Sequence, residues 1–182
     1  MSGRAPLAAL ALVLLFAAAL LSGEPQKAAP GPKGFKNLEL GKPLEEVKRL
    51  LQEEPLFDYR GDPDVSFLPL PAQVLIECRG TTYIERAYFQ FHEQRLFIII
   101  LSLRRDKLDY YSLFRTLSDK YGIPSSVSPT ESVWDFGALR LSLEKPLSVK
   151  YVDRGVFESL RERGKADRDL GDLSKKQFLE QF

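Results

Sequence analysis

Residues 84–103 constrain the fold more than any other stretch of the chain. Two runs, 84–91 and 96–103, are rich in aromatic and aliphatic residues and flank the polar sequence HEQR at 92–95. The first run alternates between apolar and polar residues with the period of a β-strand. A polar connection of this length between two such runs predicts an antiparallel hairpin. The fold must therefore contain an antiparallel sheet built around this hairpin.

Two amphipathic segments have the spacing of helices. The first begins near Pro43, and the second, expected to be capped by Asp106, includes residues 110–121. Strand patterns follow each helix, at residues 73–79 after the first and at 132–136, 138–144 and 147–152 after the second. Helices that precede runs of adjacent strands favour an α+β fold, with two helices packed on an antiparallel sheet. The similar plan of the two halves suggests two pseudo-repeated units, each a helix, a loop and strands.

The ends of the chain have a composition unlike that of the middle. Residues 1–23 combine a basic start, a long apolar run and small residues, which is the layout of a secretory signal peptide. We therefore expect a periplasmic or extracellular protein; the alternative is a protein tethered to the membrane by an uncleaved N-terminal segment. Residues 24–34 read as a flexible linker, 35–160 as a single α+β domain, and 161–182 as a charged tail with a short C-terminal helix.

The charge balance and the residue composition argue against nucleic-acid binding, metal binding and catalysis. Without residues 1–23, which contain one charged residue, Arg4, the chain has 25 basic and 25 acidic residues, so nucleic acid is not an expected partner. His92-Glu93 begins a zinc-binding His-Glu-x-x-His motif, but Leu96 stands at the second histidine and the chain has no other. Cys78 is the single cysteine. We therefore expect no cofactor, no metal and no enzymatic activity.

Two alternatives to this view remain open. Asp58, Asp62 and Asp64 lie in a turn-rich loop whose carboxylates could bind calcium, making the domain a calcium-dependent structural module. The second alternative is a small-ligand or carbohydrate-binding domain, or a small hydrolase, that uses clustered aromatic residues and carboxylates. Such a protein would need a concave pocket where at least two carboxylates meet three rings, those of Tyr59, Tyr83 and Trp134.

The strand at 96–103 is unusual because it is apolar on both sides. We expect one side to face the helices, through Phe97, Ile99, Leu101 and Leu103. Leu96, Ile98 and Ile100 lie on the other side, and Tyr88 of the neighbouring strand joins them. In a sheet with one solvent-exposed face, apolar and polar residues should alternate along each strand. These four residues break that alternation and are therefore candidates for binding a partner protein. The alternative is that residues 56–72 or the C-terminal helix cover this side.

Two segments of the sequence resemble a known family. The first is Gly41 to Val47 with Leu51 and Pro55 after it; a second version consists of Leu117, Tyr121-Gly122, Pro124 and Trp134. In these two segments the chain resembles the SmpA/OmlA family of small outer-membrane assembly proteins. The resemblance implies a helix-helix-sheet domain that binds rather than catalyses. Glu24 stands where a lipoprotein would have its lipid-bearing cysteine, so we expect no lipid anchor at the signal cleavage site.

Taken together, the sequence predicts a non-catalytic exported domain of the cell envelope that acts by protein–protein contact. Its expected partner is another envelope protein or a second copy of the chain. The biological process in which it acts is left open by the sequence.

Overall fold

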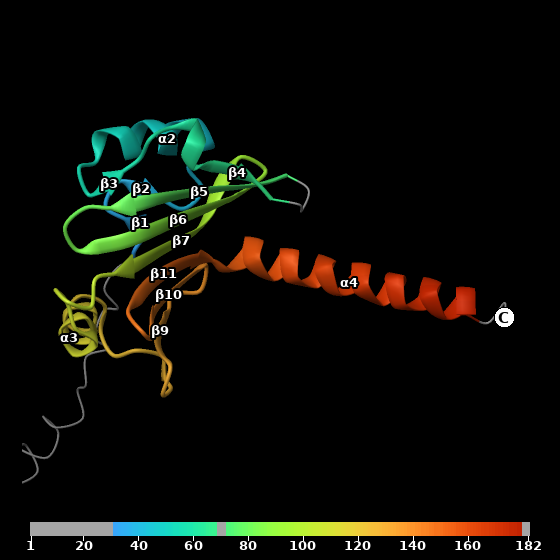
Figure 1. Ribbon diagram of the computed structural model, residues 1–182. Helices are drawn as coiled ribbons and strands as arrows, with labels where there is room; N and C mark the ends of the chain where they lie inside the picture. Colours follow the sequence, from blue (N-terminus) through green and yellow to red (C-terminus); the bar gives the residue numbers. More distant parts are fainter. Residues whose placement is uncertain (1–30, 69–71, 180–182) are drawn as a thin grey trace, which may run out of the picture.

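The computed structural model of the protein describes residues 31–68 and 72–179. The predicted signal peptide, residues 1–23, and most of the predicted linker lie outside the described residues. The described part contains a nine-stranded antiparallel sheet, a two-stranded sheet and three α-helices (Figure 1). The prediction of an α+β fold is confirmed. Among the helices of these two ranges, none is long and apolar enough to span a membrane.

The large sheet has the strand order β3-β5-β6-β7-β11-β10-β9-β8, with β4 paired to β5 beside β3. Its strands are β3 (Phe57–Asp58), β4 (Val65–Phe67), β5 (Gln73–Gly80), β6 (Ile84–His92), β7 (Arg95–Leu103), β8 (Ser126–Val127), β9 (Glu131–Asp135), β10 (Leu139–Glu144) and β11 (Ser148–Asp153). The small sheet consists of β1 (Gly34–Phe35) and β2 (Leu38–Glu39), and the helices are α2 (Leu44–Glu53), the 3-10 helix η2 (Asp62–Asp64), α3 (Tyr110–Tyr121) and α4 (Arg154–Leu179).

The main core lies on one side of the large sheet, which we call the inner face. Helices α2 and α3 pack there, and their side chains belong to one cluster with the sheet residues beneath them. Val47 of α2 and Phe89 of β6 are fully buried in this cluster. Trp134 lies under the end of α3 and donates a hydrogen bond from its indole N–H to the Gly122 carbonyl, 2.8 Å away. The inner face therefore buries most of the apolar surface that the sequence pattern predicted.

The predicted hairpin is formed by β6 and β7, with a tight turn at Glu93 and Gln94. His92 and Arg95 are the last paired residues, and both turn residues have positive φ angles, 49° and 63°. These values match the type I′ turn that suits the twist of two-residue hairpins. The zinc-like sequence thus lies at the tip of a hairpin, as the sequence predicted.

A β-bulge in β7 changes which of its residues face the core. Gln90 of β6 pairs with Ile98, whereas Phe91, the next residue, pairs with Leu96, so Phe97 is an extra residue in β7. Leu96 consequently joins the inner cluster, while Phe97 and Ile98 both point to the opposite, outer face. The predicted assignment was wrong for Leu96 and Phe97, because strict alternation does not allow for an inserted residue.

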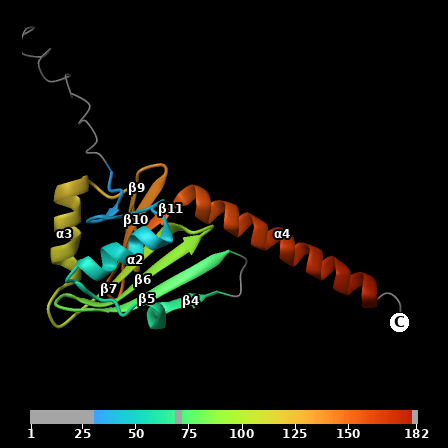
Figure 2. The same ribbon diagram turned by 90° about the horizontal axis from the view of Figure 1, so that it is seen from above.

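Helix α4 begins directly after β11 and projects away from the body of the domain (Figures 1 and 2). Its first turns pack Val156 and Leu160 on a small cluster of the outer face that contains Phe97, Ile98 and Val152. Residues 161–182 were predicted to be a charged tail with a short helix; the structure instead has a single helix from Arg154 to Leu179. The cap of α3 also differs from the prediction, since Asp109 rather than Asp106 accepts the capping hydrogen bond, from the Ser112 N–H.

Candidate functional site

The clearest hollow in the outer face lies between the first turns of α4 and strands β8 to β11. We call it the α4 groove; its volume is about 520 Å³. Val133 and Val152 contribute apolar surface from the sheet, and Phe157 contributes an aromatic ring from α4. The remaining lining is mostly charged, with Glu131, Asp135, Arg140, Glu144, Lys150 and Arg154. The α4 groove thus combines a small apolar area with a charged surround.

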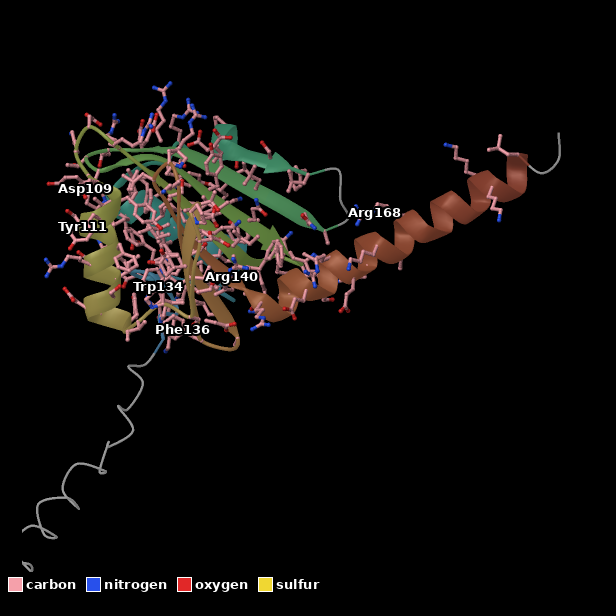
Figure 3. All side chains as sticks on the ribbon, turned by 90° about the horizontal axis from the view of Figure 1, so that it is seen from below. Asp109, Tyr111, Trp134, Phe136, Arg140 and Arg168 are labelled. Atoms are coloured by element: carbon pink, nitrogen blue, oxygen red, sulfur yellow. The ribbon has the colours of Figure 1, made fainter. Side chains whose placement is uncertain are left out.

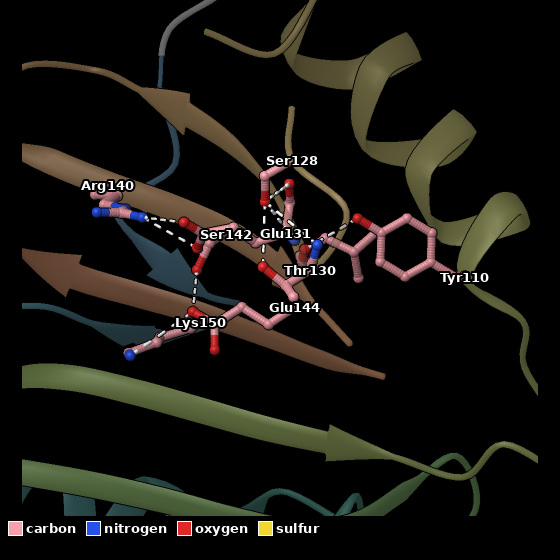
Figure 4. A network of polar contacts seen from close by, with 9 residues as sticks. Tyr110, Ser128, Thr130, Glu131, Arg140, Ser142, Glu144 and Lys150 are labelled. Atoms are coloured by element: carbon pink, nitrogen blue, oxygen red, sulfur yellow. Dashed lines mark hydrogen bonds and ion pairs between the residues drawn. The ribbon is translucent and has the colours of Figure 1, made fainter. Parts of the chain in front are cut away.

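Ion pairs between neighbouring strands arrange the charges along this groove (Figure 4). Arg140 donates two hydrogen bonds to the Glu131 carboxylate, at 2.9 and 3.0 Å. Glu144 accepts a hydrogen bond from the Ser142 hydroxyl at 2.8 Å, and the Lys150 ammonium lies 3.7 Å from the same oxygen. Because these side chains are partly exposed, each pair contributes little to stability, and their main effect is to order the charges along the groove.

The start of α4 is fixed to the sheet by both a cap and an ion pair. The Asp153 carboxylate accepts a hydrogen bond from the Val156 N–H at 3.1 Å. The Arg154 guanidinium donates to Asp135 of β9 at 2.7 Å and to Glu158 at 2.9 Å. The hydrogen bond to Glu158 and the charge of Asp135 raise the pKa of Arg154 above its usual range, so this residue stays charged. One wall of the α4 groove is therefore held in a defined position.

A smaller hollow of about 300 Å³ involves the same helix and the neighbouring strands β5 to β7. Phe97, Ile98 and Leu160 give it apolar surface, and Gln73 and Gln90 lie at the side of the sheet. Phe157, which is 42% exposed, and Arg161 line both this hollow and the α4 groove. The two hollows therefore share one exposed aromatic residue.

The four predicted partner-binding residues do not form one exposed patch. Leu96 is 1% exposed in the inner cluster, and Ile98 is 5% exposed beneath α4. Ile100 and Tyr88 are half-buried on the outer face. The patch is thus corrected, because Val156 and Leu160 in the first turns of α4 cover Ile98. These residues lie before the short C-terminal helix that the sequence suggested as a cover for this side. A role of Ile100 and Tyr88 in partner contact stays a prediction.

Phe157 was not identified from the sequence as a candidate. Its neighbourhood carries a usable signal, since Val156 and Leu160 are one helical turn apart and face the sheet, whereas Phe157 projects beside them. An aromatic residue next to an apolar i, i+4 pair on a helix that begins directly after a strand points to a partly exposed ring. That pattern could be recognised only with the helix start placed at residue 154.

The aromatic residues of the ligand-binding alternative do not come together. Trp134 is 1% exposed in the core near α3 (Figure 3), Tyr59 packs against the core after β3, and Tyr83 is exposed in the turn between β5 and β6. Strands β3 and β9 are six strand spacings apart in the sheet order, roughly 30 Å along a flat sheet. Burial, followed by the charges of Asp62 and Asp64, raises the pKa of Tyr59 to about 12. These three rings line no common pocket in the described part of the chain.

The acidic loop uses one of its carboxylates for its own structure. Asp64 is buried, and its oxygens accept hydrogen bonds from the Arg60 backbone N–H at 2.9 Å and from the Arg60 guanidinium Nε at 3.0 Å. Within residues 31–68 and 72–179, no three His, Cys, Asp or Glu side chains are grouped as metal ligands. Binding of calcium by Asp58, Asp62 and Asp64 remains a hypothesis.

The single histidine and the single cysteine both have structural surroundings. The His92 ring packs edge-on against Phe97, with centroids 6.4 Å apart, and its Nε2 lies 3.3 Å from an Arg163 nitrogen of α4. Cys78 is 3% exposed, and burial, followed by the charge of Asp64, raises the pKa of its thiol to about 12. The thiol therefore stays protonated near neutral pH and is a poor nucleophile.

Comparison with known proteins gives one match. A family model described as the TP0088 domain matches residues 33–163, which include the whole sheet and the first turns of α4. No curated protein and no solved structure matches the chain.

Proposed function

The chain belongs to the TP0088 domain family, and we propose that it is a non-catalytic, exported domain of the cell envelope that binds a partner protein. The observation that carries this proposal is the α4 groove, where a partly exposed phenylalanine lies among ordered charges of both signs. Interfaces between proteins commonly have an aromatic anchor surrounded by polar residues. The proposed contact is centred on Phe157, in place of Leu96 and Ile98.

The charges of the groove favour a protein segment over a small apolar ligand. Arg140 with Glu131 and Lys150 with Glu144 present both signs within a few ångströms of one another. A polypeptide can match such a surface with its own mixed side chains and backbone groups, and the ion pairs would then determine its orientation. Self-association through the same groove is the second form of this proposal, since either an envelope protein or another copy fits the chemistry.

Site-specific photocrosslinking in the cells that make the protein tests this proposal. A photoreactive phenylalanine analogue would replace Phe157 in the full chain, and the matched control would replace Tyr111. Tyr111 is 66% exposed on α3, well away from the start of α4 (Figure 3). We expect one defined crosslinked product from position 157 and none from position 111. The purified partner identified by mass spectrometry should then bind the wild-type chain and bind the Phe157→Ala variant at least ten times more weakly.

Two results would overturn the proposal. The first is the same set of crosslinked products from positions 157 and 111, which would mean random collision. The second is unchanged partner affinity after Phe157→Ala, together with unchanged affinity after Arg140→Gln at the other side of the groove. A product with twice the mass of the chain would identify self-association.

The exported location is a separate part of the proposal, and residues 1–23, which lie outside the described residues, support it. The mass of the protein purified from its native cells tests it directly. Loss of residues 1–23 and recovery from the periplasm or the medium would support export as a cleaved protein. A full-length mass in the membrane fraction would favour the tethered alternative, and a full-length mass in the cytoplasm would contradict export.

We also propose that the domain consists of two pseudo-repeated units, in line with the resemblance to SmpA/OmlA-like domains. Each unit would comprise one helix and a meander of three strands, α2 with β5-β6-β7 and α3 with β9-β10-β11. The strand order supports this proposal, because the third strands of the two units, β7 and β11, pair antiparallel at the centre of the sheet. Under this proposal α4 is an addition to the repeated plan and supplies the wall of the binding groove.

A further inference from the structure

A third hollow lies on the same sheet but near its opposite edge, beside β4 and η2. Its volume is about 250 Å³, and its charged and hydroxyl lining comprises Arg60, Asp64, Ser66, Glu77, Arg79 and Arg86. We call it the arginine pocket. Three guanidinium groups meet two carboxylates there, so the pocket has one excess positive charge. Its size suits a small ion or the charged end of a larger molecule.

Two of these arginines are placed in a way that the fold alone does not explain. Arg79 of β5 and Arg86 of β6 are directly opposite each other in the antiparallel register. Like charges in such a position repel and destabilise the strand pair. On the other edge of β5, Asp58 of β3 is paired with Arg79, yet the side chains of Asp58 and Arg79 form no ion pair. An anion between the two guanidinium groups would turn this repulsion into binding.

The carboxylates of the pocket are already engaged and hold arginines in position. The buried Asp64 carboxylate accepts from the Arg60 backbone N–H and from its guanidinium group, whose side chain is 66% exposed. Glu77 accepts a hydrogen bond from Arg86. One carboxylate thus orients each of Arg60 and Arg86, and each guanidinium group has further N–H groups that do not bond to that carboxylate. The carboxylates have less capacity to repel an incoming anion because arginines neutralise them.

Free donors remain in the pocket. Arg79 and the Ser66 hydroxyl form no hydrogen bond or ion pair with any side chain that the structure describes. A guanidinium group presents its N–H groups in a planar fork that matches two oxygens of a phosphate or a carboxylate. A tetrahedral oxyanion can accept from several directions at once, which matches donors from β4, β5 and β6 better than a flat carboxylate does.

From this geometry we propose that the arginine pocket binds a phosphoryl oxyanion, with Arg79 as its principal ligand and Arg60, Arg86 and Ser66 as supporting donors. The ligand is either free phosphate or a phosphate group at the end of a lipid headgroup, because both present the same oxygens. This site is separate from the α4 groove and does not depend on the proposed partner binding.

Titration of the full chain with inorganic phosphate at constant ionic strength, monitored by amide chemical shifts, tests the proposal. We expect saturable shifts concentrated in β5, β6 and η2, and none of that pattern with chloride. Arg79→Gln should weaken phosphate binding at least tenfold, and Arg79→Lys should weaken it less, since lysine retains the charge but not the fork. The matched control is Arg115→Gln, an exposed arginine on α3, which should leave phosphate affinity unchanged.

Vesicles distinguish the two sources of the phosphate group. Sedimentation of the chain with phosphatidic acid vesicles, which carry a terminal phosphate group, would identify a lipid headgroup if free phosphate competes it away and Arg79→Gln abolishes it. Phosphate binding without vesicle binding would identify the free ion. Shifts that do not saturate, or equal phosphate affinity in the wild-type and Arg79→Gln chains, would overturn the proposal. A dispersed amide spectrum of each variant verifies its folding, and Phe157→Ala should bind phosphate like the wild type.

Discussion

The inner and outer faces of the large sheet bury their side chains to very different extents. On the inner face, one cluster contains 24 buried residues, including those of α2 and α3, whereas the outer cluster has three, Phe97, Ile98 and Val152. Strands β7 and β11 supply buried residues to both clusters. The difference shows that α2 and α3 complete the core, while α4 shields a small apolar area and leaves charged surface on either side of it. Stability should therefore reside on one face and recognition on the other.

The largest effect in this comparison is expected from Phe89→Ala. Phe89 is fully buried on the inner face, with its ring 5.5 Å from that of Phe57, so its loss removes apolar contacts and leaves a cavity. The free energy of unfolding should fall by about 3–5 kcal/mol, as measured by urea denaturation. Gln90→Ala, the adjacent position on the outer side, is the matched control and should change it by less than about 0.5 kcal/mol. Similar losses for the two variants would contradict the assignment of the faces.

The inner face could be predicted from the sequence because its residues follow regular periods. The helix positions Val47 and Leu51 and the strand positions Ile76 and Phe89 recur with spacings that depend on local geometry alone. The outer face was harder, since the inserted Phe97 shifts the alternation within a single strand. A bulge depends on the partner strand as well as on its own residues, so periodicity within one strand cannot locate it.

The outer cluster should respond less to truncation than the inner core. Ile98→Ala removes a side chain that is 5% exposed, but only Phe97, Val152 and the first turns of α4 surround it. We expect a loss of about 2 kcal/mol in the free energy of unfolding, the lower end for such a change, because a shallow site can relax. Amide hydrogen exchange in the first turns of α4 should quicken, while exchange in α2 stays slow. A loss as large as that of Phe89→Ala would contradict the difference between the faces.

The candidate site could not be predicted because it depends on the path of α4. The sequence RERGKADRDLGD suggested a solvated tail, since glycines and charges are poor evidence for a packed helix. The helix is nevertheless continuous from β11, and its first two turns gain stability from Val156 and Leu160 against the sheet. Phe157 becomes part of a groove only as a result of that tertiary packing. The arginine pocket likewise depends on the register that places Arg79 opposite Arg86.

The inner face should also make stability depend on alkaline pH through Cys78. Burial, followed by the charge of Asp64, raises the pKa of its thiol from 9.0 to about 12, so the folded chain retains a proton that the unfolded chain releases. The contribution of the Cys78 thiol to the free energy of unfolding is fully present below pH 9. It is lost as the pH rises toward 12, since only the unfolded state ionises in that interval.

The measurement is the free energy of unfolding by urea at several pH values between 9 and 11. The wild type should lose up to about 1.4 kcal/mol per pH unit more than Cys78→Ala, which lacks the thiol. Parallel pH profiles for the two proteins would show that the thiol ionises equally in both states. Reaction with a thiol reagent should correspondingly require unfolding, because Cys78 is 3% exposed.

The smallest expected effect concerns the β6–β7 turn, where elements of the two faces meet. The Gln94 carbonyl accepts a hydrogen bond from the Leu44 N–H of α2 at 2.9 Å, and His92 contacts Arg163 of α4. Gln94 has a φ of 63°, which costs a residue with a Cβ roughly 1–2 kcal/mol. Gln94→Gly relieves this cost but gives the unfolded chain more freedom, worth roughly 0.5–1 kcal/mol. The net gain in the free energy of unfolding should be about 0.5 kcal/mol by urea denaturation. Gln94→Ala keeps the Cβ and should give no gain, so equal stabilities of the two variants would contradict the left-handed turn.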